Sequence, residues 1–303
     1  MKSFRIYSTL SEKQIEADIS NYFGWISPIG QTPFRLLDVN EQIYAADKRF
    51  NCAIPIYMQF KVSQGLKRLP ALVPHIPNFS YRIRSFRRKN DLYDNPTLYF
   101  KLRDIAPSAE DFQHNILLSL ANAGQSHAFY VAPLTLDKDD YYKMLTASAD
   151  RFMPFPFHYD NNIIHQENWI SYLGMVPFLR GNISITPHER VSSSKHYYSF
   201  SPTGTEIAWH SPKIISHDAS RLSDRLIEIF KDAFVNKKNW VDLDEYAALI
   251  KNKYDFYQGK EVEKNTDSSS LQRILDFGKM LHRKYYIRQM LILSNRESLN
   301  KLT

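Results

Sequence analysis

The fold of this 303-residue chain turns on one stretch, Ile56-Tyr57-Met58-Gln59-Phe60-Lys61-Val62-Ser63. Its alternation predicts a strand that places Tyr57, Gln59 and Lys61 on one face and apolar side chains on the other. Pro55 fits the first position of such a strand, where a missing N–H is tolerated. The stretch is therefore expected to anchor itself in a core while it presents polar groups on its opposite face.

A carboxylate side chain, that of Asp47, lies upstream of this strand, twelve positions before Gln59. If Asp47 lies on a neighbouring strand, a carboxylate, a carboxamide and an ammonium converge on one point. Such a set can hold a divalent metal and steer a water at a phosphate. Taken singly, Asp47 fits an exposed turn and Lys61 a solvated strand position, so it is the joint arrangement that points to a site.

A long basic stretch surrounds this strand. From Lys48 through Asn90 there are ten Lys or Arg residues and no Asp or Glu. This block is typical of a phosphate-facing surface. The segment 81–87 is predicted as a strand with one basic face, although its aromatic side chains also fit an inward-packing role. The predicted nucleic-acid contacts are Lys67, Arg68, Arg82, Arg84, Arg87, Arg88 and Lys89.

Composition narrows the class of protein. The hydrophobic share of 43% is ample for a core, and the net charge of +7 permits attraction to a polyanion. Cys52 is the single cysteine, so no intramolecular disulfide is expected and a cytoplasmic location fits. No window approaches the ~20 apolar residues of a membrane helix, so no membrane partner is expected. Glycine-rich phosphate loops, GxSxG and metal-ligand spacing of histidines are absent from the sequence.

The pattern along the chain predicts an α/β (α+β) protein. Ser11 caps a first helix that Gly24 ends. The other predicted helices cover 109–123, capped by Ser108, and 137–150, 220–235, 242–253 and 269–294. The other predicted strands cover 98–103, 127–133, 169–173 and 196–200. Three regions follow: a core over 1–150, a β-rich extension over 151–213 and a helical C-terminal region over 214–303.

This order of elements, with Asp47 before the Gln59-Phe60-Lys61 strand, resembles the PD-(D/E)XK nuclease superfamily. The resemblance implies a restriction-endonuclease-like mixed-sheet core in the first ~150 residues. It also implies a helical acid, for which Glu12 and Glu16 compete with Glu41. Gln59 stands where glutamate is more usual, and no proline precedes Asp47. The implied cofactor is Mg²⁺ or Mn²⁺, with Asp47, Gln59 and Glu16 as metal ligands and Asp47, Gln59, Lys61 and Glu41 as catalytic groups.

The helix after the 98–103 strand contributes Gln113 and His114 at its start, and the resemblance places polar groups that support the site there. The Gln-x-x-x-Tyr motif of the exonuclease branch is absent, because Leu117 stands four positions after Gln113. An ordinary histidine on a helix face is the alternative for His114.

The resemblance implies a metal-dependent endonuclease that hydrolyses phosphodiester bonds of nucleic acid, with DNA favoured over RNA. By analogy it also suggests an effector of prokaryotic antiviral defence. The alternative is a catalytically inactive relative that binds nucleic acid or a partner protein in a larger complex. A homo-oligomer built through the helical C-terminus is a third possibility.

Overall fold

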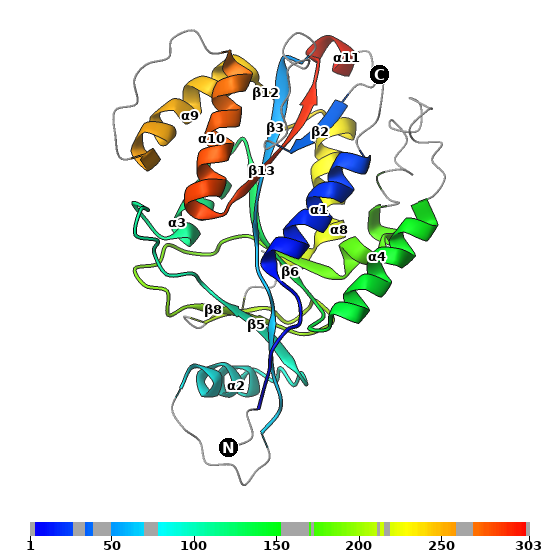
Figure 1. Cartoon of the computed structure of the whole chain (residues 1–303), viewed down its shortest axis with the longest axis vertical. Coiled ribbons are helices and arrows are strands. Elements are labelled where there is room, and N and C mark those ends of the chain that lie inside the picture. The colour runs from blue at the N-terminus through cyan, green and yellow to red at the C-terminus, as the bar shows by residue number, and fades with distance from the viewer. Residues whose placement is uncertain are drawn as a thin grey trace.

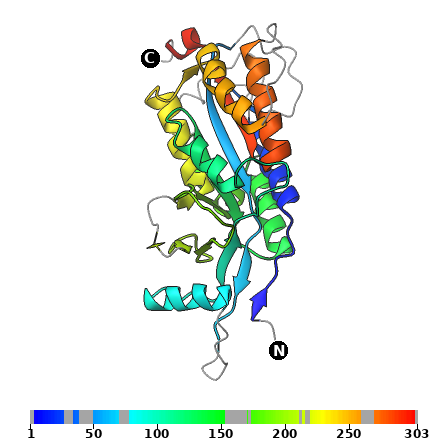
Figure 2. The same ribbon diagram turned by 90° about the vertical axis from the view of Figure 1, so that its left-hand side faces the viewer.

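Two β-sheets joined through one long strand form the frame of the protein. The computed structural model describes residues 4–26, 34–38, 50–69, 78–152, 170, 173–210, 213–214, 219–258 and 269–300. Figures 1 and 2 show the larger sheet among helices and the smaller sheet beyond its end, where the isolated helix α2 (Phe79–Lys89) lies. A mixed α/β fold is thereby confirmed.

The main sheet has the order β11-β7-β6-β3-β13-β2, and β12 also pairs with β3. β3 and β6 run parallel, and the other pairs of this sheet are antiparallel. Its strands are β2 (Phe34–Asp38), β3 (Cys52–Phe60), β6 (His127–Pro133), β7 (Asn182–Ile185), β11 (Ala219–Arg221), β12 (Val241–Asp242) and β13 (Arg288–Ser294). It therefore draws strands from all three regions of the chain.

The small sheet is antiparallel, with the order β1-β4-β5-β8-β9-β10. Its strands are β1 (Arg5–Ile6), β4 (Gln64–Leu66), β5 (Thr97–Lys101), β8 (Tyr197–Phe200), β9 (Ala208–His210) and β10 (Lys213–Ile214). Because β4 follows β3 after three residues, the chain passes directly from one sheet to the other at 61–63. Lys61 lies at this junction.

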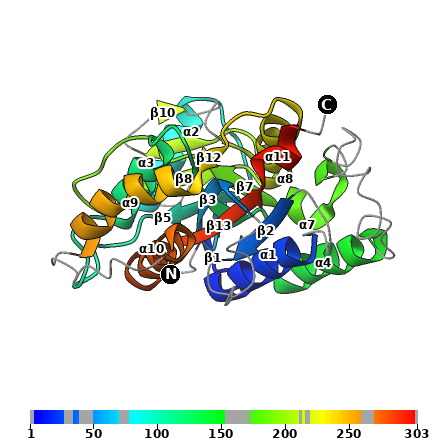
Figure 3. The same ribbon diagram turned by 90° about the horizontal axis from the view of Figure 1, so that it is seen from above.

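Helices cover both faces of the main sheet, which gives three layers (Figures 1 and 3). The core on one face includes side chains of α3 (Gln113–Ala121), α9 (Leu243–Gln258) and α10 (Ser270–Tyr285). The core on the other face includes side chains of α1 (Glu12–Ile26), α4 (Lys138–Phe152), α7 (Pro177–Arg180) and α8 (Leu222–Phe230). A 3-10 turn at Leu173–Met175, a π-helical turn at Lys231–Val235 and α11 (Arg296–Asn300) complete the described elements.

β3 divides its side chains between these two cores as the alternation predicts. Tyr57 belongs to the core with α9 and α10, whereas Ile56, Met58 and Phe60 belong to the core with α1. At the start of the strand, the thiol of Cys52 is fully buried and donates to the carbonyl of Ser294 in β13 at 3.2 Å. The strand is covered on both faces along its whole length.

The predicted helix over 269–294 is wrong in its last third. The helix ends at Tyr285, and Arg288–Ser294 forms β13, which lies between β3 and β2 in the main sheet. Tyr286 turns the chain in the left-handed region with φ of 54°. The "helical" C-terminal region therefore supplies an interior strand of the main sheet.

The predicted strand over 81–87 is also wrong, because these residues lie in α2. Asn78 caps the helix by accepting from the Tyr81 N–H at 3.0 Å, and Ile83 packs against Leu66 and Tyr99 of the small sheet. The predicted strand over 169–173 is not seen where the structure describes these residues. Helix α3 begins at Gln113, later than Ser108 suggested. The remaining predictions are confirmed as to helix or strand. They are the elements at 12–26, 52–60, 97–101, 127–133, 138–152 and 197–200, together with α8 and α9.

Candidate functional site

Gln59 and Lys61 lie where β3 leaves the main sheet, and both are buried, with exposed fractions of 1% and 3%. The N–H of Lys61 donates to the Val131 carbonyl of β6 at 2.8 Å, which continues the parallel pairing beyond the end of β3. This backbone bond fixes the direction in which the lysine side chain leaves the strand.

The Lys61 ammonium is held by helix α3. Its Nζ donates to Oε1 of Gln113 at 3.0 Å and lies 6.0 Å from the centroid of the Tyr130 ring. Gln113 is itself fixed, because its Nε2 donates to the Tyr285 carbonyl at the end of α10. Gln113, which the sequence analysis expects to support the site, thus contacts Lys61 directly, and its role in a reaction stays a prediction.

Burial determines the charge of Lys61. Desolvation lowers the pKa of Lys61 to about 8, and the positive charge of Arg103 adds to this effect while the carboxylate of Glu12 opposes it. Glu12 and Arg103 form a partly exposed ion pair of 3.5 Å. A lysine with this pKa carries its charge at neutral pH and loses it in mildly alkaline solution.

His114 is a buried structural contact. Its Nε2 lies 2.8 Å from the Glu189 carbonyl and its Nδ1 lies 2.9 Å from the Tyr130 hydroxyl. Because a carbonyl can only accept, Nε2 carries the proton and Nδ1 accepts from Tyr130. Desolvation lowers the pKa of His114 to about 4, so the ring is neutral near pH 7. His114 joins α3 to β6 through Tyr130, the residue whose ring also lies near the Lys61 ammonium.

The amide of Gln59 leaves one polar atom without a partner. Its Nε2 donates to the Phe60 carbonyl at 2.9 Å, whereas its buried Oε1 accepts no hydrogen bond from the residues that the structure describes. An orphaned buried carbonyl oxygen is uncommon and calls for a missing donor or cation. The Gln59 oxygen at the end of β3 thus remains unpaired among the described residues.

Glu16 is not brought to this oxygen. It lies on α1, where neighbouring Ile15 and Ile19 enter the core on the opposite face of the main sheet from Tyr57. Its carboxylate accepts from His282 at 2.8 Å and pairs with Arg288 at 3.0 Å. Burial would raise the pKa of Glu16, but the His282 hydrogen bond and the Arg288 charge hold it below its usual value. Glu16 thus stabilises the contact of α1 with α10 and β13.

The described residues alone do not make a magnesium site. Asp47 and Glu41 lie outside the described residues. Within the described ranges, no cluster of three or more His, Cys, Asp or Glu side chains could hold a metal ion. An amide oxygen beside an ammonium does not meet the preference of Mg²⁺ for carboxylates and several oxygens. The sequence-based hypothesis assigns such carboxylates to Asp47 and Glu41.

The predicted nucleic-acid contacts fall into two groups. Side chains of the first group are exposed and lie on α2 or on the turn after β4: Lys67, Arg68, Arg82, Arg88 and Lys89. Arg84 is half-buried, and its guanidinium donates to the carbonyls of Lys67 and Phe4 at 3.0 Å each. These residues keep the basic surface that the sequence predicts, on a helix instead of a strand.

Arg87 has a structural role. It is 2% exposed, pairs with the buried Asp94, and donates to the Ser199 hydroxyl at 3.2 Å and the Glu206 carbonyl at 2.8 Å. A guanidinium with these partners is not available to a phosphate, so the prediction for Arg87 is corrected. The helical period explains it, because Ser80, Ile83 and Arg87 form the buried side of α2.

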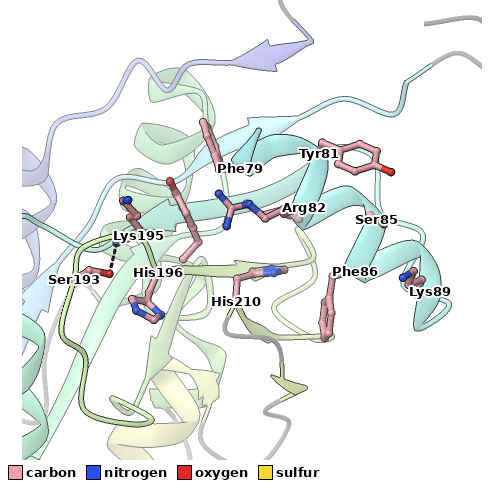
Figure 4. A pocket seen from close by; sticks show the side chains of 12 residues that line it. Phe79, Tyr81, Arg82, Ser85, Phe86, Lys89, Ser193, Lys195, His196 and His210 are labelled. Atoms are coloured by element: carbon pink, nitrogen blue, oxygen red, sulfur yellow. Dashed lines mark hydrogen bonds between the residues drawn. The ribbon is translucent and has the colours of Figure 1, made fainter. Parts of the chain in front are cut away.

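Two clefts flank α2. One, of about 700 Å³, lies on the β4 side and is lined by Lys67, Arg68, Arg84 and Arg88 among others. The other, of about 500 Å³, lies between α2 and the strands β8 and β9 (Figure 4). Arg82 and Lys89 line the second cleft from α2, and Lys195, His196 and His210 line it from the other side.

Sequence reasoning missed Tyr130, Lys195, His196 and His210. Tyr130 reaches Lys61 because β6 runs parallel to β3, a pairing that no local pattern reveals. His196 and His210 come together through the pairing of β8 with β9, since Tyr197 lies opposite His210. No signal in their sequence spacing points to either residue.

Compared with protein-family models, with curated proteins and with solved structures, the chain gives no significant match. Within the described ranges, no helix is long and apolar enough to cross a membrane.

Proposed function

We propose that this protein hydrolyses phosphodiester bonds of nucleic acid at a centre that contains Gln59 and Lys61. The observation that carries the proposal is the buried Lys61 ammonium, held 3.0 Å from Gln113 at the end of β3. A fixed cation can offset the negative charge that develops on a phosphate during hydrolysis without reorganising at the moment of reaction. The resemblance to PD-(D/E)XK nucleases, made on Asp47, Gln59 and Lys61, supports the same role.

Each residue has a distinct part in this proposal. Lys61 contacts the phosphate, and Gln113 is a positioning residue that holds the ammonium. Gln59 contributes its unpartnered carbonyl oxygen, and Asp47 would contribute the carboxylate that a divalent metal needs. When bound, Mg²⁺ or Mn²⁺ would supply a nucleophilic water at neutral pH.

Cleavage assays with Mg²⁺ or Mn²⁺ on single-stranded DNA, duplex DNA and RNA test this proposal. We expect Lys61→Met and Asp47→Asn to lower the cleavage rate about 100-fold or more, as removal of one charge-stabilising group does elsewhere. Lys143→Met is the matched control, because Lys143 is exposed on α4 and paired with Asp140. Cleavage that persists in both site variants, or that EDTA leaves intact, would overturn the assignment.

Binding without cleavage is the second candidate function. Two observations favour it: the described residues contain no cluster of three or more side chains that could hold a metal ion, and Lys61 is 3% exposed, so its ammonium faces the protein. The same assay separates the two functions. A wild-type protein that binds the oligonucleotides in a salt-sensitive manner and cleaves none of them is a nuclease-like binding module.

A further inference from the structure

The cleft between α2 and the β8–β9 strands has an ordered lining. Phe79, Arg82, Phe86 and Lys89 stand at helical positions i, i+3, i+7 and i+10, so they share one side of α2. Aromatic rings and cations thus alternate along the helix. In Figure 4 Arg82 and Lys89 extend from α2, with Lys195 and His210 on the other side of the cleft.

The charge of the cleft favours a polyanion. Arg82, Lys89 and Lys195 are exposed, and none of them forms an ion pair with a described residue. Among the described residues that line the cleft, none is acidic. Three unpaired cations along one cleft of about 500 Å³ match a chain of phosphates better than they match a single small anion.

The two phenylalanine rings that line the cleft differ in whether a face of the ring is open to a ligand. Phe79 is already in contact with the stacked Tyr197 ring at 5.0 Å and with the Arg5 guanidinium at 4.3 Å. Among the described residues, the aromatic ring in contact with Phe86 is that of His210, at 80° and 5.2 Å, so no described parallel ring covers Phe86. Phe86 therefore has a face against which a planar group can stack.

The ring of His196 belongs to the other face of the small sheet. It stacks on Trp209 at 5.1 Å and 9°, and Trp209 also stacks on His114 at 5.3 Å and 11°. Trp209 lies in the core with α3, whereas Tyr197 and His210 line the cleft. Because successive strand side chains point to opposite faces, the His196 ring points away from the cleft, and Phe86 is left as the stacking platform among the described rings.

We propose that this cleft binds single-stranded nucleic acid. Arg82, Lys89 and Lys195 contact successive phosphates, while an unpaired base stacks on Phe86. A duplex is a poorer occupant because its bases are stacked on one another and offer no free face to this ring. This inference names the class of substrate for the nuclease proposed above and rests on that proposal. Binding can nevertheless be tested without cleavage.

Fluorescence anisotropy in EDTA, with labelled 12-nucleotide DNA and RNA strands and the matching DNA duplex, tests the proposal. The absence of metal keeps cleavage out of the measurement, so a failed nuclease assay does not affect the result. We expect the single strands to bind at least tenfold more tightly than the duplex. Equal or tighter binding of the duplex would overturn the proposal.

Two variants locate the site. We expect the triple variant Arg82→Gln, Lys89→Gln, Lys195→Gln to weaken single-strand binding at least tenfold. Its slope of log affinity against log salt should fall by about 2, as expected for three lost phosphate contacts. The matched control is Lys143→Gln, Lys238→Gln, Lys279→Gln, which removes the same charge from exposed positions outside the cleft. Equal affinities of the two triple variants would overturn the proposal.

Phe86→Leu tests stacking separately from charge. We expect a loss of about five- to tenfold in affinity with an unchanged salt slope, because stacking on one ring is lost and no phosphate contact is. Far-ultraviolet circular dichroism checks that α2 is retained. If Phe86→Leu does not fold, the two triple variants, which change exposed side chains alone, still decide the question.

Discussion

Lys61 carries its charge in surroundings that disfavour a charge. Its ammonium has one described hydrogen-bond acceptor, the neutral amide oxygen of Gln113, and an aromatic ring nearby. Burial without a carboxylate in direct contact is costly for stability. A group retained under these conditions is a reason to look for function, because strongly shifted titrating groups concentrate at functional sites.

Replacing Lys61 by Met should therefore change how stability depends on pH. The pKa of Lys61 lies at about 8 in the folded protein against 10.5 for an ordinary lysine. Between these values the unfolded chain binds a proton that the folded protein does not, so the stability of the wild type rises with pH through this window. Relative to the wild type, Lys61→Met should be more stable at pH 7 than at pH 10.5 by about 3 kcal/mol. Urea unfolding at both pH values measures this difference, and a pH-independent difference would contradict it.

At the scale of elements, local pattern decides some assignments and long-range pairing decides others. The alternation of β3 is strong, and its two faces follow from the sequence. Residues 81–85 alternate as well, but over so few residues a period of two is hard to tell from a helical one. The cap at Asn78 and the burial of Ile83 and Arg87 select the helix.

The missed strand β13 has a different cause. Most helices that end in a left-handed residue use glycine, whereas Tyr286 takes that conformation here with φ of 54°. The sequence therefore contains no stop signal after α10. The candidate site also combines local and long-range features. That Gln59 and Lys61 share a face follows from the local alternation of the strand. The sheet face that α1 covers, and with it the position of Glu16, depends on the whole fold.

The cap of α2 gives a prediction for this element. Asn78→Ala removes the acceptor of the Tyr81 N–H, and we expect a loss of about 1 kcal/mol in helix stability. Asn78→Ser retains an oxygen at the cap and should lose only a small part of this. Amide hydrogen exchange of residues 79–89 measures both. Equal exchange in the two variants would contradict a capping role for Asn78.

At the scale of the molecule, the candidate centre and the cleft are joined by packed rings. His114 accepts from Tyr130 beside Lys61, and its ring stacks on Trp209, which also stacks on His196, the residue before Tyr197 of the cleft. The two sheets meet in the same place, since β3 continues into β4 through Lys61. An occupant of the cleft would thus rest on the same framework that holds the lysine.

The central position of β13 predicts how the whole fold responds to substitution. Leu291 and Ile292 are both fully buried, but they enter the cores on opposite faces of the main sheet. We expect Leu291→Ala and Ile292→Ala each to lower the free energy of unfolding by about 2–5 kcal/mol. Leu249→Ala, at a 52% exposed position of α9, should lower it by less than about 1 kcal/mol. Denaturant unfolding compares the three, and a small loss at either β13 position would show that one face is loosely covered.

The thiol of Cys52, the single cysteine, can report how often the centre of the main sheet opens. Thiol reagents attack the thiolate, and burial raises the pKa of Cys52 to about 11, so the folded protein presents neither the charged sulfur nor a path to it. Because Cys52 donates to Ser294, its labelling requires β3 to separate locally from β13. The rate of alkylation under native conditions therefore measures how often this pair of strands opens.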